Sequence, residues 1–205
     1  ISTVGGYAYS HSRDTVNVNM YMESKATLAV KNQAVSLTQT TNYPWDGDIR
    51  LRVRPETPTR FTIKLRIPRW VQGRPIPGNL YKYLDTQAGE ISVAVNSRPV
   101  DPVVDRGYVS LTRRWQAGDT IQLVLPMPIR RVVAHPKVTA DKGLVAVERG
   151  PIVYCAEFKD NDLDVSELKL PDSASFSATF EPEFLGGAVT LYSDDKPDLK
   201  LIPYY

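Results

Sequence analysis

IRLRVRPETPTRFTIKLRI, residues 49–67, alternates apolar with polar side chains on either side of a segment that contains two prolines. A period of two places one face of a strand in the core and the other in water. The two runs therefore predict two half-buried strands joined by a turn. The same alternation recurs at residues 15–22, 26–30, 91–95, 109–111 and 121–125.

Many short alternating strands separated by turn residues are typical of sandwiches and barrels. Asp46-Gly47 is one such turn signal, because it lies between two alternating runs. We therefore predict an all-β, antiparallel β-sandwich fold, built as two sandwich domains or as one complete and one partial domain.

A division of the chain is expected near residues 126–143, where three prolines do not suit a central strand. We predict a first β-sandwich over residues 1–130 and a second, smaller one over 131–205. The second would be truncated or would share strands with residues 1–30. Within it, residues 144–158 predict two strands buried on both faces or one kinked strand, residues 159–183 look irregular, and 185–192 form a last clear strand.

Composition excludes several classes of function. The net charge of +2 over 205 residues does not provide the strongly basic face of a nucleic-acid binder. The chain also has no apolar run long enough for a membrane span. The single cysteine, Cys155, excludes an internal disulfide and a cysteine-rich zinc site. We predict no cofactor and no metal, and the compartment stays open between periplasm and cytoplasm of a bacterium.

Catalytic motifs are scarce, and no catalytic residue is predicted. Cys155 lies in an apolar strand pattern and His135 beside a proline, so both are interpreted as structural. Paired carboxylates could hydrolyse a glycoside, and the candidates by spacing are Asp46 with Asp48 and Glu148 with Glu157. Turn formation and an ion pair beside Arg149 are the preferred interpretations of these acids.

The acidic run over residues 160–164 superficially resembles a calcium loop. The glycine and glutamate that an EF-hand needs are replaced by Val165 and Pro171. We interpret the run as a solvated loop.

Two groups of residues are candidate contact sites. Tyr43, Trp45, Asp46 and Trp70 are predicted sugar or domain contacts, because aromatic rings serve both purposes. The second group is basic and shares one face if strands 49–54 and 61–67 form a hairpin, which predicts a docking face for something acidic: Arg50, Arg52, Lys64 and Arg66. A solvated face with screened charges is the alternative.

Several strings, taken in order, resemble the region that follows the catalytic barrel in β-L-arabinofuranosidase-like glycoside hydrolases, family 127 and its relatives. They are VNMYMES (18–24), YPWDG (43–47), LRIPRW (65–70), GYV (107–109), WQAGD (115–119), LPMP (125–128) and ERGPIVYC (148–155). The resemblance covers nearly the whole chain.

The resemblance implies a helical (α/α) barrel with a catalytic glutamate and a cysteine-rich zinc site, followed by two β-sandwich domains. None of that barrel is in these 205 residues, and Cys155 matches a cysteine of a sandwich strand. We therefore expect a non-catalytic accessory module of a glycoside hydrolase acting on arabinofuranosides, packed on an upstream catalytic barrel. The alternative is a carbohydrate-binding module with aromatic stacking residues. A homodimer and a carbohydrate are further partners to test, and a free-standing hydrolase is disfavoured.

Overall fold

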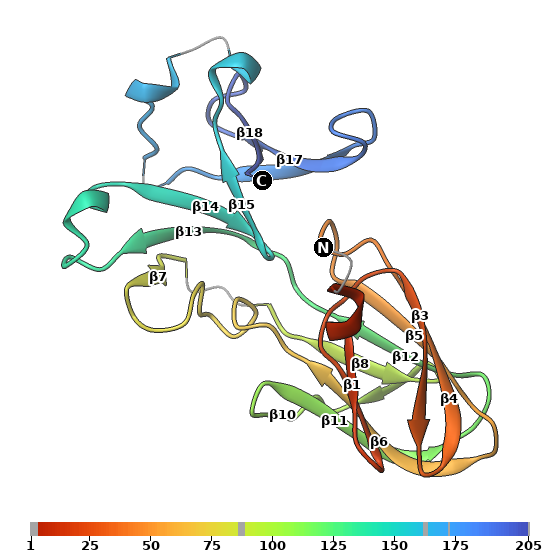
Figure 1. Ribbon diagram of the computed structural model, residues 1–205. Coiled ribbons are helices and arrows are strands. Elements are labelled where there is room, and N and C mark those ends of the chain that lie inside the picture. The colour runs from red at the N-terminus through yellow and green to blue at the C-terminus, as the bar shows by residue number, and fades with distance from the viewer. Residues whose placement is uncertain (1–3, 86–88, 162–163, 172, 205) are drawn as a thin grey trace. The chain divides into compact units, whose positions relative to one another are not determined.

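The computed structural model describes residues 4–85, 89–161, 164–171 and 173–204 (Figure 1). These residues form strands, turns and short 3-10 helices, which confirms the predicted all-β fold. The chain folds as two compact units, Ile1–Gln72 with Ala88–Met127 and Gly73–Gln87 with Pro128–Tyr205. The described residues contain no helix with the length and apolarity needed to cross a membrane.

The first unit is a sandwich of two sheets. The five-stranded sheet has the order β1 (Tyr9–His11), β2 (Thr15–Val18), β6 (Thr59–Arg66), β11 (Tyr108–Trp115) and β10 (Val104–Asp105). The six-stranded sheet has the order β3 (Ser24–Val30), β4 (Gln33–Thr41), β5 (Asp48–Pro55), β12 (Asp119–Val124), β8 (Ser92–Val95) and β9 (Arg98–Val100). Among the described strands of this unit, β2 and β6 run parallel and the other pairs are antiparallel.

Alternation along the strands builds the core of this sandwich. Ile49, Leu51 and Val53 of β5 are buried while the arginines between them are exposed. In the other sheet Trp115 is fully buried against Phe61, with ring centroids 6.1 Å apart, and its indole N–H donates to the Phe61 carbonyl oxygen at 3.1 Å. The period-two pattern thus sorts side chains as predicted.

The second unit contains one seven-stranded antiparallel sheet. Its order is β16 (Phe176–Glu181), β17 (Ala188–Ser193), β18 (Lys200–Pro203), β15 (Ile152–Cys155), β14 (Val145–Arg149), β13 (Ile129–Ala134) and β7 (Tyr81–Tyr83). The short 3-10 helices of the chain are η1 (Val4–Tyr7), η2 (Thr139–Asp141), η3 (Phe158–Asp160) and η4 (Val165–Glu167).

The region 126–143 contains the junction of the two units, at Met127 and Pro128, and also β13, whose residues lie between Pro128 and Pro136. Two other local expectations differ from the structure. The region 159–183 contains β16, whose side chains are mostly exposed because it is an edge strand, so no alternation marked it. Residues 144–158 form two strands as expected, but Leu144 and Val153 are exposed, so these strands are not buried on both faces.

Candidate functional site

Tyr21, Tyr43, Trp70 and Tyr108 gather near the β4–β5 loop and form what we call the aromatic corner. The rings of Tyr21 and Tyr43 meet edge to face with centroids 5.8 Å apart, and the Trp70 side chain lies beside Tyr43. The Tyr21 hydroxyl donates to the carbonyl oxygen of Arg66. The predicted contact residues Tyr43 and Trp70 are therefore brought together.

Burial gives the aromatic corner little acid–base character. It raises the pKa of the Tyr21 hydroxyl well above its usual value, and the neighbouring Tyr43 adds to the rise. Burial also raises the pKa of Tyr43, against the opposing effects of Trp70 and Arg66. Trp70 is only 7% exposed, whereas Trp45 is half-buried. Trp45 thus has more surface available to a partner than Trp70.

The two aspartates of the β4–β5 loop hold the loop in shape. Asp46 accepts from the Asp48 backbone N–H at 3.0 Å and from the Asn42 amide at 3.2 Å. Asp48 accepts from Arg50 at 2.8 Å and from Gln122 at 2.9 Å. These contacts support the interpretation of both acids as turn and strand-end residues.

The four basic residues of the predicted docking face lie on two different sheets. Arg50 and Arg52 are on β5, which pairs with β4 and β12. Lys64 and Arg66 are on β6, which pairs with β2 and β11. The expected hairpin between these strands is therefore wrong, because the turn at 55–59 carries the chain from one sheet of the sandwich to the other. The docking role itself stays a prediction.

Glu148 belongs to a partly buried cluster in the second unit. The Tyr83 hydroxyl donates to it at 2.7 Å, and the Arg130 guanidinium lies 3.6 Å from the centroid of the Tyr83 ring. Arg130 is also the cross-strand neighbour of Glu148 in the β13–β14 register. Burial raises the pKa of Glu148, while Tyr83 and Arg130 oppose the rise. The cluster joins β7, β13 and β14.

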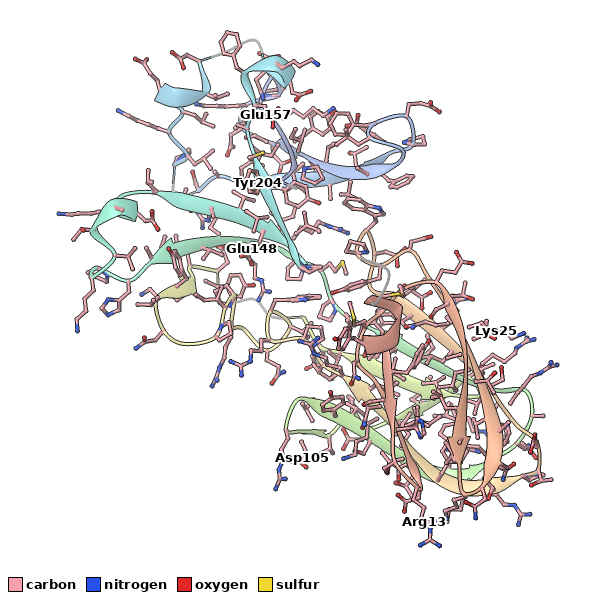
Figure 2. The ribbon with its side chains drawn as sticks, viewed as in Figure 1. Arg13, Lys25, Asp105, Glu148, Glu157 and Tyr204 are labelled. Carbon is pink, nitrogen blue, oxygen red and sulfur yellow. The ribbon has the colours of Figure 1, made fainter. Side chains whose placement is uncertain are left out.

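Glu148 and Glu157 lie on opposite sides of the Tyr204 label in Figure 2. Glu148 faces Val153 across the β14–β15 pair, and Glu157 follows four residues later in extended backbone. At about 3.3 Å per residue this is roughly 13 Å along the strand. The Glu148 carboxylate accepts from the Tyr83 hydroxyl at 2.7 Å, which supports a structural interpretation of this residue.

The surroundings of Cys155 and His135 support a structural role for both side chains. Burial raises the pKa of the Cys155 thiol, and the carboxylates of Glu157 and Asp160 add to the rise. A raised pKa disfavours the reactive thiolate. The His135 Nδ1 accepts from the Lys137 backbone N–H at 3.1 Å, which fixes the ring within its turn.

The acidic run over 160–164 lies partly outside the described residues, at 162 and 163. The Asn161 side chain is buried and donates to the carbonyl oxygens of Glu157 and Lys200 at 2.7 and 3.1 Å, so it pins this segment to β18. Within the described ranges no group of three or more His, Cys, Asp or Glu side chains could hold a metal ion.

Two family models match this chain. The model of the β-L-arabinofuranosidase GH127 middle domain matches residues 15–127, and that of the glycoside hydrolase family 127 C-terminal domain matches residues 129–205. A protein named non-reducing end β-L-arabinofuranosidase, from Bifidobacterium longum subsp. longum, is 31% identical over all of this chain and 33% of its own length.

Solved structures agree with these matches. A GH127 β-arabinofuranosidase superposes with a TM-score of 0.91 at 43% identity, over 98% of this chain and 34% of its own. A GH127 β-L-arabinofuranosidase from Geobacillus stearothermophilus T6 superposes with a TM-score of 0.85 at 35% identity, over 100% of this chain and 33% of its own. The chain thus spans about a third of the length of these relatives.

Proposed function

Because the chain belongs to glycoside hydrolase family 127, we propose that it is the accessory, non-catalytic part of a β-L-arabinofuranosidase-like glycosidase. The observation that carries the proposal is the match to a middle domain and a C-terminal domain of this family. The chain also covers only about a third of the length of its relatives. A middle domain implies a domain before it. By family resemblance that domain is a helical barrel with the catalytic glutamate.

We propose that the partly exposed residues of the aromatic corner, Tyr43 and Tyr108, contact this upstream domain, while the buried Tyr21 and Trp70 support them from within. The N-terminal end of the first unit lies beside the corner, where the Asn19 amide donates to the Tyr7 carbonyl oxygen at 3.4 Å. Asn19 also accepts from the Tyr108 hydroxyl at 2.9 Å and, through its backbone oxygen, from Arg66 at 3.3 Å. Tyrosine, tryptophan and arginine are enriched in interfaces. A domain joined before Tyr7 would therefore be adjacent to suitable contact residues.

The lack of catalysis in this chain is tested by a turnover assay. The purified chain is incubated with β-L-arabinofuranosides, with the full-length Bifidobacterium relative as positive control. We expect no release of arabinose by the chain. Release that is abolished by Glu148→Gln would overturn the proposal. The coding sequence upstream of residue 1 provides an independent test, since a catalytic domain is expected there.

A carbohydrate-binding module with stacking aromatics is the second candidate function. The partial exposure of Trp45 favours it as the stacking residue. Calorimetry with neutral arabino-oligosaccharides separates the two candidates, and we expect no binding. Micromolar binding that disappears with Trp45→Ala would favour the binding module instead.

Homodimer formation is also part of the proposal. Light scattering on the purified chain, at several concentrations, tests homodimer formation, because a dimer has twice the mass of the single chain.

A further inference from the structure

The outer face of the six-stranded sheet is hollowed into a groove of about 920 Å³. Strands β3, β4, β5, β12 and β8 contribute to its lining, and Lys25 marks this face in Figure 2. The lining combines four cations with hydroxyl side chains from both sides of β5. The cations are Lys25, Arg50, Arg52 and Arg54.

The register of the sheet orders these side chains into rows. Arg52 lies between Thr38 of β4 and Thr120 of β12, and Thr38 in turn faces Lys25 of β3. Along β5 the three arginines occupy alternate positions, so they are spaced about 6.6 Å apart. The groove therefore has a central line of positive charge with hydroxyl groups on each side.

These charges are poorly neutralised by the chain itself. Arg50 pairs with Asp48 at 2.8 Å, but its side chain remains 67% exposed. Across the described part of the chain, no ion pair is formed by Lys25, Arg52 or Arg54, and none of the described groove residues is a carboxylate. The net charge of +2 for the whole chain hides this concentration of cations on one sheet.

We propose that this groove binds an acidic oligosaccharide, a linear sugar chain that carries carboxylates at regular intervals. Arginine pairs with carboxylates through two parallel hydrogen bonds. The flanking threonine and serine hydroxyls suit the ring hydroxyls of a sugar, because each can donate and accept. The volume falls in the range of about 300–1,000 Å³ that ligand sites occupy. The site is separate from the aromatic corner and does not depend on the accessory role.

Other anionic partners fit this surface less well. A protein interface needs apolar or aromatic side chains at its centre, whereas Leu51 and Ile121 in the groove floor are only 1% exposed. Single-stranded nucleic acid stacks its bases on aromatic rings, and the described lining contains none. A single small anion would use one or two cations rather than a line of about 13 Å.

The test is calorimetry of the 205-residue chain with galacturonate oligomers of about four to six units at roughly 20 mM salt. We expect a Kd of roughly 10 µM to 1 mM, and a loss of at least about tenfold in affinity at about 500 mM salt because exposed charges are screened. The same oligomers with reduced carboxyl groups are expected not to bind. Arg52→Gln with Arg54→Gln should weaken binding about 20-fold, since charge-assisted hydrogen bonds are lost.

Arg60→Gln with Arg114→Gln is the matched control. These two exposed arginines face each other on the five-stranded sheet, so the charge change is identical and the groove is intact. We expect unchanged affinity. Absence of binding at low salt, or an equal loss in the control, would contradict the proposal. Equal affinity for a glutamate hexapeptide would also overturn it, in favour of an acidic protein partner.

Discussion

Gly47 shows how a single residue holds the first unit together. Its carbonyl oxygen accepts from the Leu125 backbone N–H at 2.9 Å, so the β4–β5 loop touches the chain just after β12. A Cβ at this position would lie 1.9 Å from the Leu125 carbonyl oxygen. The glycine of the Asp46-Gly47 signal is therefore needed for a close backbone approach.

Gly47→Ala is expected to destabilise the protein by about 3 kcal/mol, the upper part of the range for overpacking, because the obstructing atom belongs to the backbone. Urea unfolding followed by fluorescence measures the loss. Gly6→Ala is the control, since a methyl group added there would have no atom within 4 Å, and it should leave the midpoint unchanged. A Gly47→Ala variant as stable as the wild type would contradict the close approach.

The short strand β7 is held in its sheet partly by side-chain hydrogen bonds. It has three residues and pairs only with β13 among the described strands. Asp85 follows it and accepts from Arg131 three times, from the backbone N–H at 2.8 Å, Nη2 at 2.7 Å and Nε at 3.3 Å. Together with the Tyr83–Glu148 hydrogen bond, these contacts attach β7 to the sheet.

Asp85→Asn is expected to cost about 1.5–3 kcal/mol at pH 7, the range for hydrogen bonds to a charged group. The Arg131 hydrogen bond holds the pKa of Asp85 below its usual value. A lowered pKa in the folded state gives stability that is present above the unfolded pKa and is lost as the pH falls through the folded pKa. The difference between variant and wild type should therefore shrink as the pH falls below about 4, the usual pKa of an aspartate.

Urea unfolding at about pH 7 and at several pH values below about 4 measures this difference. Asp105→Asn is the control, because Asp105 is exposed and forms no ion pair with any of the described residues. A difference that stays constant with pH would mean that the charge of Asp85 contributes nothing.

At the scale of the whole molecule, two separate segments of the chain form the second unit. Residues 73–87 leave the first unit between β6 and β8 and supply β7, and the chain returns to the second unit at Pro128. The family models divide the chain between residues 127 and 129, and they include residues 73–87 in the middle domain. We propose that the first sandwich folds independently, and that residues 73–85 become ordered only when the second unit is present.

A chain of residues 1–127 is therefore expected to fold, with strand amides protected in hydrogen exchange. The amides of residues 81–84 should exchange rapidly, because β13 is missing and the Leu84 N–H no longer reaches the Arg131 carbonyl oxygen. Exchange of the full chain is the reference. Protection of residues 81–84 in the shorter chain, or its failure to fold, would contradict the proposed independence.

Much of the fold could be predicted from local patterns. Ile49, Leu51 and Val53 are buried as their alternation predicts, since side-chain direction in a strand follows directly from position. The Thr38 and Thr40 positions in the groove alternate in the same way and could have been read from the sequence. The pairing of Tyr83 with Glu148 could not, because 65 residues separate them.

The sequence by itself determined the all-β class, the inward and outward faces of β5, and the family to which the chain belongs, because each depends on residue order alone. Only the tertiary structure decided which strands pair. It separated Arg50 and Arg52 from Lys64 and Arg66, and it placed β7 beside β13. The physical reason is that strand pairing is set by contacts between distant segments, which alternation within a single strand does not encode.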